Sequence, residues 1–86
     1  MTTLSQVRTN DVVRLVVFEN ELGRETKNIF QTKGLHKGCI LRIISSGGVI
    51  IIQDIIEKRT YALSQKYAKH LRVIEMNAKR KITDKK

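Results

Sequence analysis

The residue types that the sequence lacks already exclude several classes of protein, before any motif is considered. It contains no proline, no tryptophan and a single cysteine, Cys39, which cannot form an intrachain disulfide and fits a reducing cytosol. Its apolar runs, such as residues 49–52, are only four residues long, far below the roughly 20 that a membrane-spanning helix needs. The N-terminus lacks the basic stretch followed by an apolar one that marks a signal peptide. We therefore expect a cytoplasmic protein without a transmembrane segment.

Acidic residues are also scarce. The 86 residues include 17 Lys and Arg but only 8 Asp and Glu, which gives a net charge of +9 at neutral pH. Residues 77–86 hold five basic residues and one acid, so this segment carries +4 of the +9. Because it is also poor in apolar side chains, we expect residues 77–86 to form a basic, disordered tail. We expect the other residues, 1–76, to form one small domain with a modest hydrophobic core.

A short helix is predicted over residues 24–33, from the spacing of its apolar residues. The residues predicted on its buried face are Thr26, Ile29 and Phe30. Asn20 or Glu21, in the polar connection before it, is expected to cap its N-terminus.

A glycine-bearing corner follows this helix, and the rest of the chain is organised around it. Gly34 stands where a helix C-terminus requires a left-handed residue, a conformation that glycine adopts without a Cβ clash. Phe30 and Leu35 then occupy the two positions whose side chains touch in a Schellman motif. Gly38 closes the next turn, and a strand pattern begins after it. Gly34, Leu35 and Gly38 are therefore predicted to be the structural turn of the fold.

Short apolar runs rich in β-branched residues predict strands in most of the remaining chain. They occupy residues 12–18, 39–44, 49–53, 60–63 and 71–76. Turns are predicted at residues 45–48, where two glycines supply positive φ, and at residues 54–59. Ser64 is placed to cap a single helical turn through Lys69 with its hydroxyl. Short strands and tight turns in so small a chain favour a closed or nearly closed barrel, because closure removes sheet edges.

Four short motifs carry a resemblance to a known family through their order and spacing along the chain. The corner, Gly34-Leu35-x-x-Gly38 with Leu41-x-Ile43 after it, resembles the L-G-L-x-P-G-x-x-V-x-V stretch of the FeoA family. The opening T-L-S-x-L-x-x-G-D of that family is similar to Thr3-Leu4-Ser5 with Asn10-Asp11. Its G-P-V or G-P-I strand start resembles Gly48-Val49-Ile50. Its closing A-L-x-x-x-x-A-x-x-I-x-V pattern is matched by Ala62-Leu63, Ala68, Leu71 and Val73.

Some positions depart from the family pattern. Asn10 stands where glycine is usual, and asparagine tolerates a left-handed turn. Lys37 and Val49 replace prolines, and the turn at residues 54–59 lacks the family's glycine. The basic segment 77–86 is extra.

The resemblance implies a mainly β fold, a small SH3-like barrel of about five short antiparallel strands. One helix is inserted, and a short helical turn precedes the last strand. It also implies a bacterial, non-enzymatic accessory protein of ferrous iron uptake, without a cofactor, that docks on the cytoplasmic domain of a FeoB-like ferrous iron transporter. Such domains also form the C-terminal module of metal-dependent repressors, but no helix-turn-helix precedes this one. The alternative, favoured by charge alone, is a small basic SH3-like protein that binds RNA or the ribosome.

Few residues are suited to metal binding or catalysis. The soft or borderline metal ligands are His36, Cys39 and His70, whereas a structural zinc site needs four ligands. We therefore predict an exposed turn histidine and a strand thiol, and no metal site. The acids Glu19, Glu21 and Glu25 cluster near the expected helix start, where they complement the helix dipole. Because no phosphate-binding loop or nucleophile elbow is present, we predict no catalytic residue.

Basic side chains form the candidate contact surface. They are Lys66, Lys69, Arg72, Lys79, Arg80 and Lys81. A single-strand binder places stacking aromatics beside such charge, but Phe18 and Phe30 are expected in the core. The basic tail is therefore expected to give only weak, non-specific contact with nucleic acid or an anionic membrane.

Overall fold

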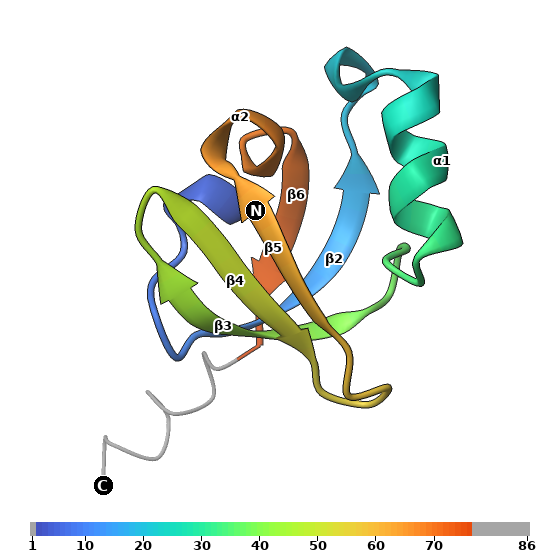
Figure 1. Cartoon of the computed structure of the whole chain (residues 1–86). Coiled ribbons are helices and arrows are strands. Elements are labelled where there is room, and N and C mark those ends of the chain that lie inside the picture. Colours follow the sequence, from blue (N-terminus) through green and yellow to red (C-terminus); the bar gives the residue numbers. More distant parts are fainter. Residues whose placement is uncertain (1, 77–86) are drawn as a thin grey trace, which may run out of the picture.

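The computed structural model describes residues 2–76, whose strands all join one antiparallel sheet (Figure 1). The strand order is β1-β6-β2-β3-β4-β5. The strands are β1 (Thr2–Thr3), β2 (Val12–Phe18), β3 (Ile40–Ser46), β4 (Val49–Asp54), β5 (Thr60–Ser64) and β6 (Leu71–Glu75). The helical segments are η1 (Leu4–Gln6), η2 (Asn20–Leu22), α1 (Arg24–Thr32) and α2 (Gln65–Ala68). The predicted mainly β fold, with one helix after the first long strand and a helical turn before the last, is confirmed.

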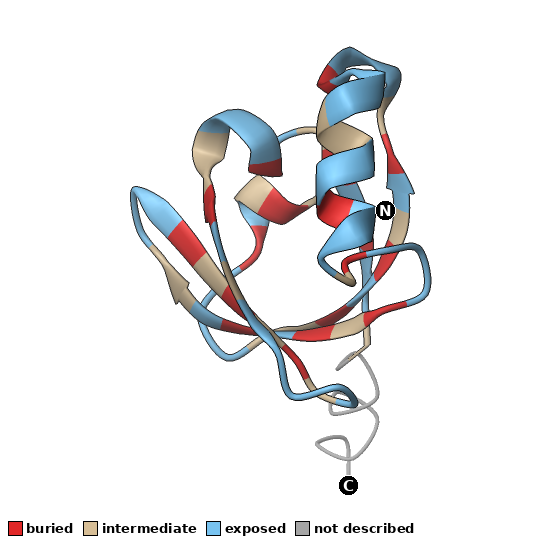
Figure 2. Ribbon diagram, turned by 45° about the vertical axis from the view of Figure 1, so that its right-hand side comes forward, coloured by how far each residue is buried: buried red, intermediate tan, exposed pale blue. Residues whose placement is uncertain are grey.

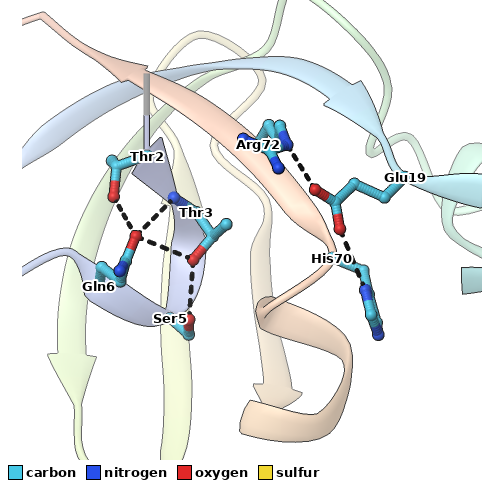
Figure 3. Close-up of polar contacts among 7 residues, drawn as sticks. All are labelled: Thr2, Thr3, Ser5, Gln6, Glu19, His70 and Arg72. Carbon is cyan, nitrogen blue, oxygen red and sulfur yellow. Dashed lines mark hydrogen bonds and ion pairs between the residues drawn. The ribbon is translucent and has the colours of Figure 1, made fainter. Parts of the chain in front are cut away.

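The sheet has one strand more than predicted. β1 pairs with β6 through only two residues, which is too short for a periodic signal in the sequence. The backbone N–H of Thr3 donates to the side-chain oxygen of Gln6 at 3.2 Å, and Leu4 of η1 is fully buried (Figure 3). β1 and β5 are the two ends of the sheet and do not pair with each other, so hydrogen bonds do not close the barrel.

The core lies inside the curl of the sheet, with buried residues on the inner faces of the strands (Figure 2). Alternate residues of paired strands are fully buried there, such as Leu15 opposite Val73. A β-bulge between Leu15 and Val17 shifts this alternation in β2, so that Phe18 faces the core and Val17 is exposed. The apolar run that ends β2 therefore has one side in the core and one in solvent. Its composition alone does not show which residues lie on which side.

The end of α1 has the predicted Schellman geometry. Gly34 has a φ of 101°, and its N–H donates to the carbonyl of Gln31 at 3.0 Å. The N–H of Leu35 donates to the carbonyl of Phe30 at 2.9 Å, and both of these side chains are buried. These two bonds are the pair that defines the motif.

The start and the apolar face of α1 differ from the prediction. Gly23, with a φ of 91°, is the N-cap residue, because Asn20 and Glu21 are already part of the separate helical turn η2. Ile29 is 53% exposed, so Phe30 is the only residue of α1 in the buried core. The helix therefore contacts the core through the Phe30 side chain alone, and not through a stripe of apolar side chains.

Two further predictions on turns were wrong in detail. β3 continues through Ser45 to Ser46, so the predicted turn reduces to Gly47 and Gly48, neither of which has a positive φ. Ser64 is the N-cap residue of α2, but its hydroxyl makes no capping bond. This buried oxygen has no hydrogen-bond partner among the described residues.

Gly38, with a φ of 94°, closes the turn that follows Leu35, whereas two other turns place a residue other than glycine at positive φ. Asn10 has a φ of 77°, as its place in the family pattern suggested. In the predicted turn at residues 54–59, Lys58 has a φ of 65°. The buried carboxylate of Asp54 accepts the N–H groups of Ile56 and Glu57, each at 3.0 Å, which fixes that turn.

No helix among residues 2–76 is both long and apolar enough to cross a membrane. The predicted basic tail, residues 77–86, lies outside the described residues.

We predict that Gly34→Val lowers the free energy of unfolding more than Gly23→Val does. Both changes place a β-branched residue at positive φ, which costs about 1–2 kcal/mol. At Gly34 the new Cβ would also lie 2.3 Å from Nη1 of Arg59 and 3.1 Å from the Tyr61 hydroxyl, whereas nothing lies within 4 Å at Gly23. Urea unfolding measures both losses. Equal losses would show that the contact with Arg59 and Tyr61 adds nothing, and unchanged stability of Gly34→Val would contradict the helix end itself.

Candidate functional site

The C-terminus of α1 is joined to the start of β5. Lys33 is the C-cap residue of α1, and its carbonyl is one of the helix-end acceptors that no backbone N–H of the helix can reach. Nη1 of Arg59 donates to this oxygen at 3.2 Å, and the Tyr61 hydroxyl donates to it at 3.0 Å. Burial raises the pKa of Tyr61 above its ordinary value of 10.0, so the hydroxyl keeps its proton at neutral pH and can donate.

A groove of about 480 Å³ lies between the end of α1 and β5. We call it the α1–β5 groove. Its lining residues are Phe30, Lys33, Arg59, Thr60, Tyr61, Ala62 and Leu63. The buried side chains of Phe30 and Leu63 make its apolar part, and Lys33 and Arg59 are exposed. Two cations and no acid line the groove, so its electrostatic field favours an anionic group.

A second polar site links the end of β2 to β6 (Figure 3). One carboxylate oxygen of Glu19 accepts a hydrogen bond from Nδ1 of His70 at 3.2 Å, and the other accepts from Nε of Arg72. These two bonds, first that of His70 and then that of Arg72, lower the pKa of Glu19 below its ordinary value of 4.5. The network therefore holds Glu19 as a carboxylate at neutral pH.

The same site brings together three groups that can ligate a metal. The ligand atoms of Glu19, Glu21 and His70 all lie within 4.8 Å of one another. A cation there would compete for Glu19 with the guanidinium of Arg72, whose positive charge lies on the same carboxylate. The arrangement is therefore better suited to an ion-pair network than to a metal centre. Of the three acids interpreted as complementing a helix dipole, Glu25 lies in the first turn of α1 and Glu21 in that of η2, whereas Glu19 is the N-cap residue of η2.

The three candidate metal ligands of the sequence do not share one site. His36 is exposed, and its Nδ1 lies 3.0 Å from the carbonyl of Lys37. Cys39 is buried, with Sγ 3.5 Å from the backbone N of His36 and from the carbonyl of Gly34. Burial raises the pKa of the Cys39 thiol above 9.0, so it stays protonated at neutral pH and is a poor ligand or nucleophile. His70 belongs to the network of Glu19.

The predicted basic contact surface is only partly assembled among the described residues. Lys66 and Lys69 line a second hollow, of about 290 Å³, together with Glu21, Leu22, Tyr67 and His70. The ammonium of Lys66 lies 5.7 Å from the centre of the Tyr67 ring. Arg72 is instead paired with Glu19. The other three predicted residues, Lys79, Arg80 and Lys81, lie outside the described residues.

Sequence reasoning missed the groove and the Glu19 network. Arg59 is 26 residues from Lys33, and Glu19 is 53 residues from Arg72, so no local spacing connects either pair. The one available signal was Tyr61, an aromatic residue with a polar group in a predicted strand. A buried tyrosine needs a partner for its hydroxyl, and an orphan carbonyl at a helix end is a suitable one.

Comparison with known proteins defines the class by its fold. No protein-family model matches the chain, and a search of curated proteins gives no match. Among solved structures, two manganese-dependent transcriptional repressors, one in complex with manganese, match with TM-scores of 0.78 and 0.76 at 18% identity. Each match covers 87% of this chain but only 36% and 41%, respectively, of the repressor chain. The chain thus has a fold that also occurs as one part of a larger protein.

A further match is to a whole small protein. The crystal structure of an iron uptake regulatory protein, FeoA, matches with a TM-score of 0.74 and 21% identity. The match covers 87% of this chain and 96% of the FeoA chain. The resemblance that the sequence motifs indicated is therefore confirmed for the fold, a small SH3-like barrel.

We predict that Glu19→Gln destabilises the protein at neutral pH and that the difference from the wild type vanishes in acid. The pKa of Glu19 is lowered in the folded state, so its carboxylate stabilises the fold above pH 4.5. This contribution is lost as the pH falls through the lowered pKa. Thermal unfolding from pH 7 to pH 3 measures the gap, with Glu75→Gln, an exposed acid of β6, as the control. A gap that stays constant down to pH 3 would contradict the assignment.

Proposed function

We propose that this protein is a non-enzymatic accessory protein of ferrous iron uptake, which docks on the cytoplasmic part of a ferrous iron transporter. The observation that carries the proposal is the match of the barrel to 96% of a FeoA chain named as an iron uptake regulatory protein. The matched repressors are covered only to 36% and 41%. The order of the sequence motifs around the Gly34 corner supports the same assignment. The proposed location is the cytoplasm, where such a transporter would present its partner domain.

The polar groups of the described residues support a binding role over a catalytic one. The Cys39 thiol is buried and protonated, and Glu19 is held by His70 and Arg72. Neither group is free to attack or protonate a substrate. The α1–β5 groove, in contrast, combines buried apolar side chains with two exposed cations, a composition suited to a protein partner.

The net charge of +9 favours a second candidate, a small nucleic-acid-binding protein. Of this charge, +4 belongs to residues 77–86. Among the described basic candidates, Arg72 is neutralised by Glu19. The two functions therefore place binding on different parts of the chain: on the barrel for a transporter, and mainly on the tail for nucleic acid.

We predict that removal of residues 77–86 leaves transporter binding largely intact and abolishes RNA binding. Residues 77–86 offer only Ala78 and Ile82 as apolar side chains, so the shortened barrel should fold. Binding of both chains to the transporter's cytoplasmic domain and to single-stranded RNA is measured at several salt concentrations. Any RNA binding that remains should depend less on salt, because the loss of five basic residues flattens the slope of log K against log salt by up to roughly 3.5.

The same measurement can overturn the proposal. Tight RNA binding by the shortened barrel, together with no binding to the transporter domain, would contradict the iron-uptake function and favour the nucleic-acid alternative. Circular dichroism of the shortened chain is the control, since it shows whether a loss of binding reflects a loss of fold.

A further inference from the structure

β5 is the last strand of the sheet, and one of its sides faces no other described strand. The N–H of Asp54 donates to the carbonyl of Arg59 at 2.7 Å. This bond shows which of the opposite residues of β4 and β5 are hydrogen-bonded pairs. In an antiparallel ladder the bonded pairs alternate, so Tyr61 and Leu63 bond toward β4. The backbone N–H and C=O groups of Thr60 and Ala62 therefore point away from β4. They offer a short row of unused donors and acceptors.

The α1–β5 groove runs beside this free edge. Residues 60–63 of β5 all line it, and Phe30 and Lys33 of α1 form the opposite wall. The bonds from Arg59 and Tyr61 to the Lys33 carbonyl hold the two walls at a fixed separation. A segment that enters the groove thus meets a preformed site, which lowers the entropic cost of binding.

We propose that the α1–β5 groove binds an extended, acidic segment of a partner protein, which adds to the sheet as a strand beside β5. Backbone hydrogen bonds to Thr60 and Ala62 would hold the segment, as in other cases of strand addition. Its alternate apolar side chains would contact Phe30 and Leu63, and its acids would approach Lys33 and Arg59. The inference rests on the proposed function only in treating the protein as one that docks on another protein.

Charge favours an acidic segment of another protein over two other possible occupants of the groove, the chain's own residues 77–86 and a second copy of the chain. Residues 77–86 carry +4, so the chain's own tail would be repelled by Lys33 and Arg59. A second copy of the chain would bring another molecule of net charge +9, and its own β5 contains no acid. An acidic segment of a different protein is the occupant that complements the groove.

The test uses NMR titration of the full-length, ¹⁵N-labelled protein with three seven-residue peptides. They are Thr-Glu-Val-Glu-Val-Glu-Thr, its basic counterpart with Lys in place of Glu, and Thr-Glu-Pro-Glu-Pro-Glu-Thr. The proline peptide keeps the charge but lacks two of the backbone N–H groups and the conformational freedom that a new strand needs. We expect the first peptide to shift the amides of residues 60–63 and to bind at least roughly tenfold more tightly than the other two.

Two lysine variants separate local contact from overall charge. Lys33 is the C-cap residue of α1 and Lys69 that of α2, so Lys33→Glu and Lys69→Glu make the same change at equivalent helix positions. Only Lys33 lines the α1–β5 groove. Lys33→Glu should weaken binding of the acidic peptide by roughly three- to tenfold, while Lys69→Glu should have little effect.

Several outcomes would overturn the inference. They are equal binding of the two acidic peptides, shifts confined to residues outside the groove, equal effects of both variants, or no binding at millimolar peptide. Tighter binding of oligouridylate RNA to the same amides would also overturn it. A parallel titration with the transporter's cytoplasmic domain distinguishes a failure of the groove proposal from a failure of the proposed function. Domain binding that Lys33→Glu leaves unchanged would contradict the groove alone, and peptide binding without domain binding would contradict the iron-uptake function alone.

Discussion

The carbonyl oxygen of Lys33 is the point on which the arrangement of helix and sheet depends. It accepts hydrogen bonds from Arg59 and Tyr61, and these are the bonds that join the end of α1 to the last strand of the sheet. The oxygen is accessible because Gly34 turns the chain away with a positive φ and has no Cβ. Any larger side chain at that position would place an atom 2.3 Å from the Arg59 guanidinium. The same glycine therefore ends the helix and leaves room for the side chains that attach it.

Local features of the fold could be predicted from the sequence, because each has a local cause. The end of α1 followed from the order Phe30, Gly34 and Leu35, since a Schellman motif requires only neighbouring residues. The long strands followed from runs of β-branched residues. The helix face did not, because α1 touches the core through Phe30 alone and Ile29 lies on the solvent side. Which side a short helix buries is set by the sheet it packs against.

The candidate site was far less accessible to prediction. Its central contacts join residues 26 and 28 positions apart, and nothing in the sequence pairs Lys33 with Arg59 or Tyr61. Ser64 illustrates the opposite error, since its position before α2 was predicted correctly but its hydroxyl makes no capping bond. Residue type indicated where a cap could form, whereas tertiary packing decided where the hydroxyl points.

The distribution of charge connects the fold to the proposed role. Arg72 is neutralised by Glu19, but Lys33 and Arg59 line a groove without an acid. A basic protein with such a groove is suited to an acidic segment on a partner, and its likeness in fold to FeoA supports the proposal that this partner belongs to iron uptake. Residues 77–86 add a charge of +4, which would speed encounter with an anionic partner.

Amide hydrogen exchange at β5, with and without the transporter's cytoplasmic domain, tests the account most directly. In the free protein, the amides of Thr60 and Ala62 should exchange quickly and those of Tyr61 and Leu63 slowly, because only the latter bond toward β4. When the transporter domain is bound, Thr60 and Ala62 should become protected. Protection of these two amides in the free protein, or a complex that leaves them unprotected, would contradict the account.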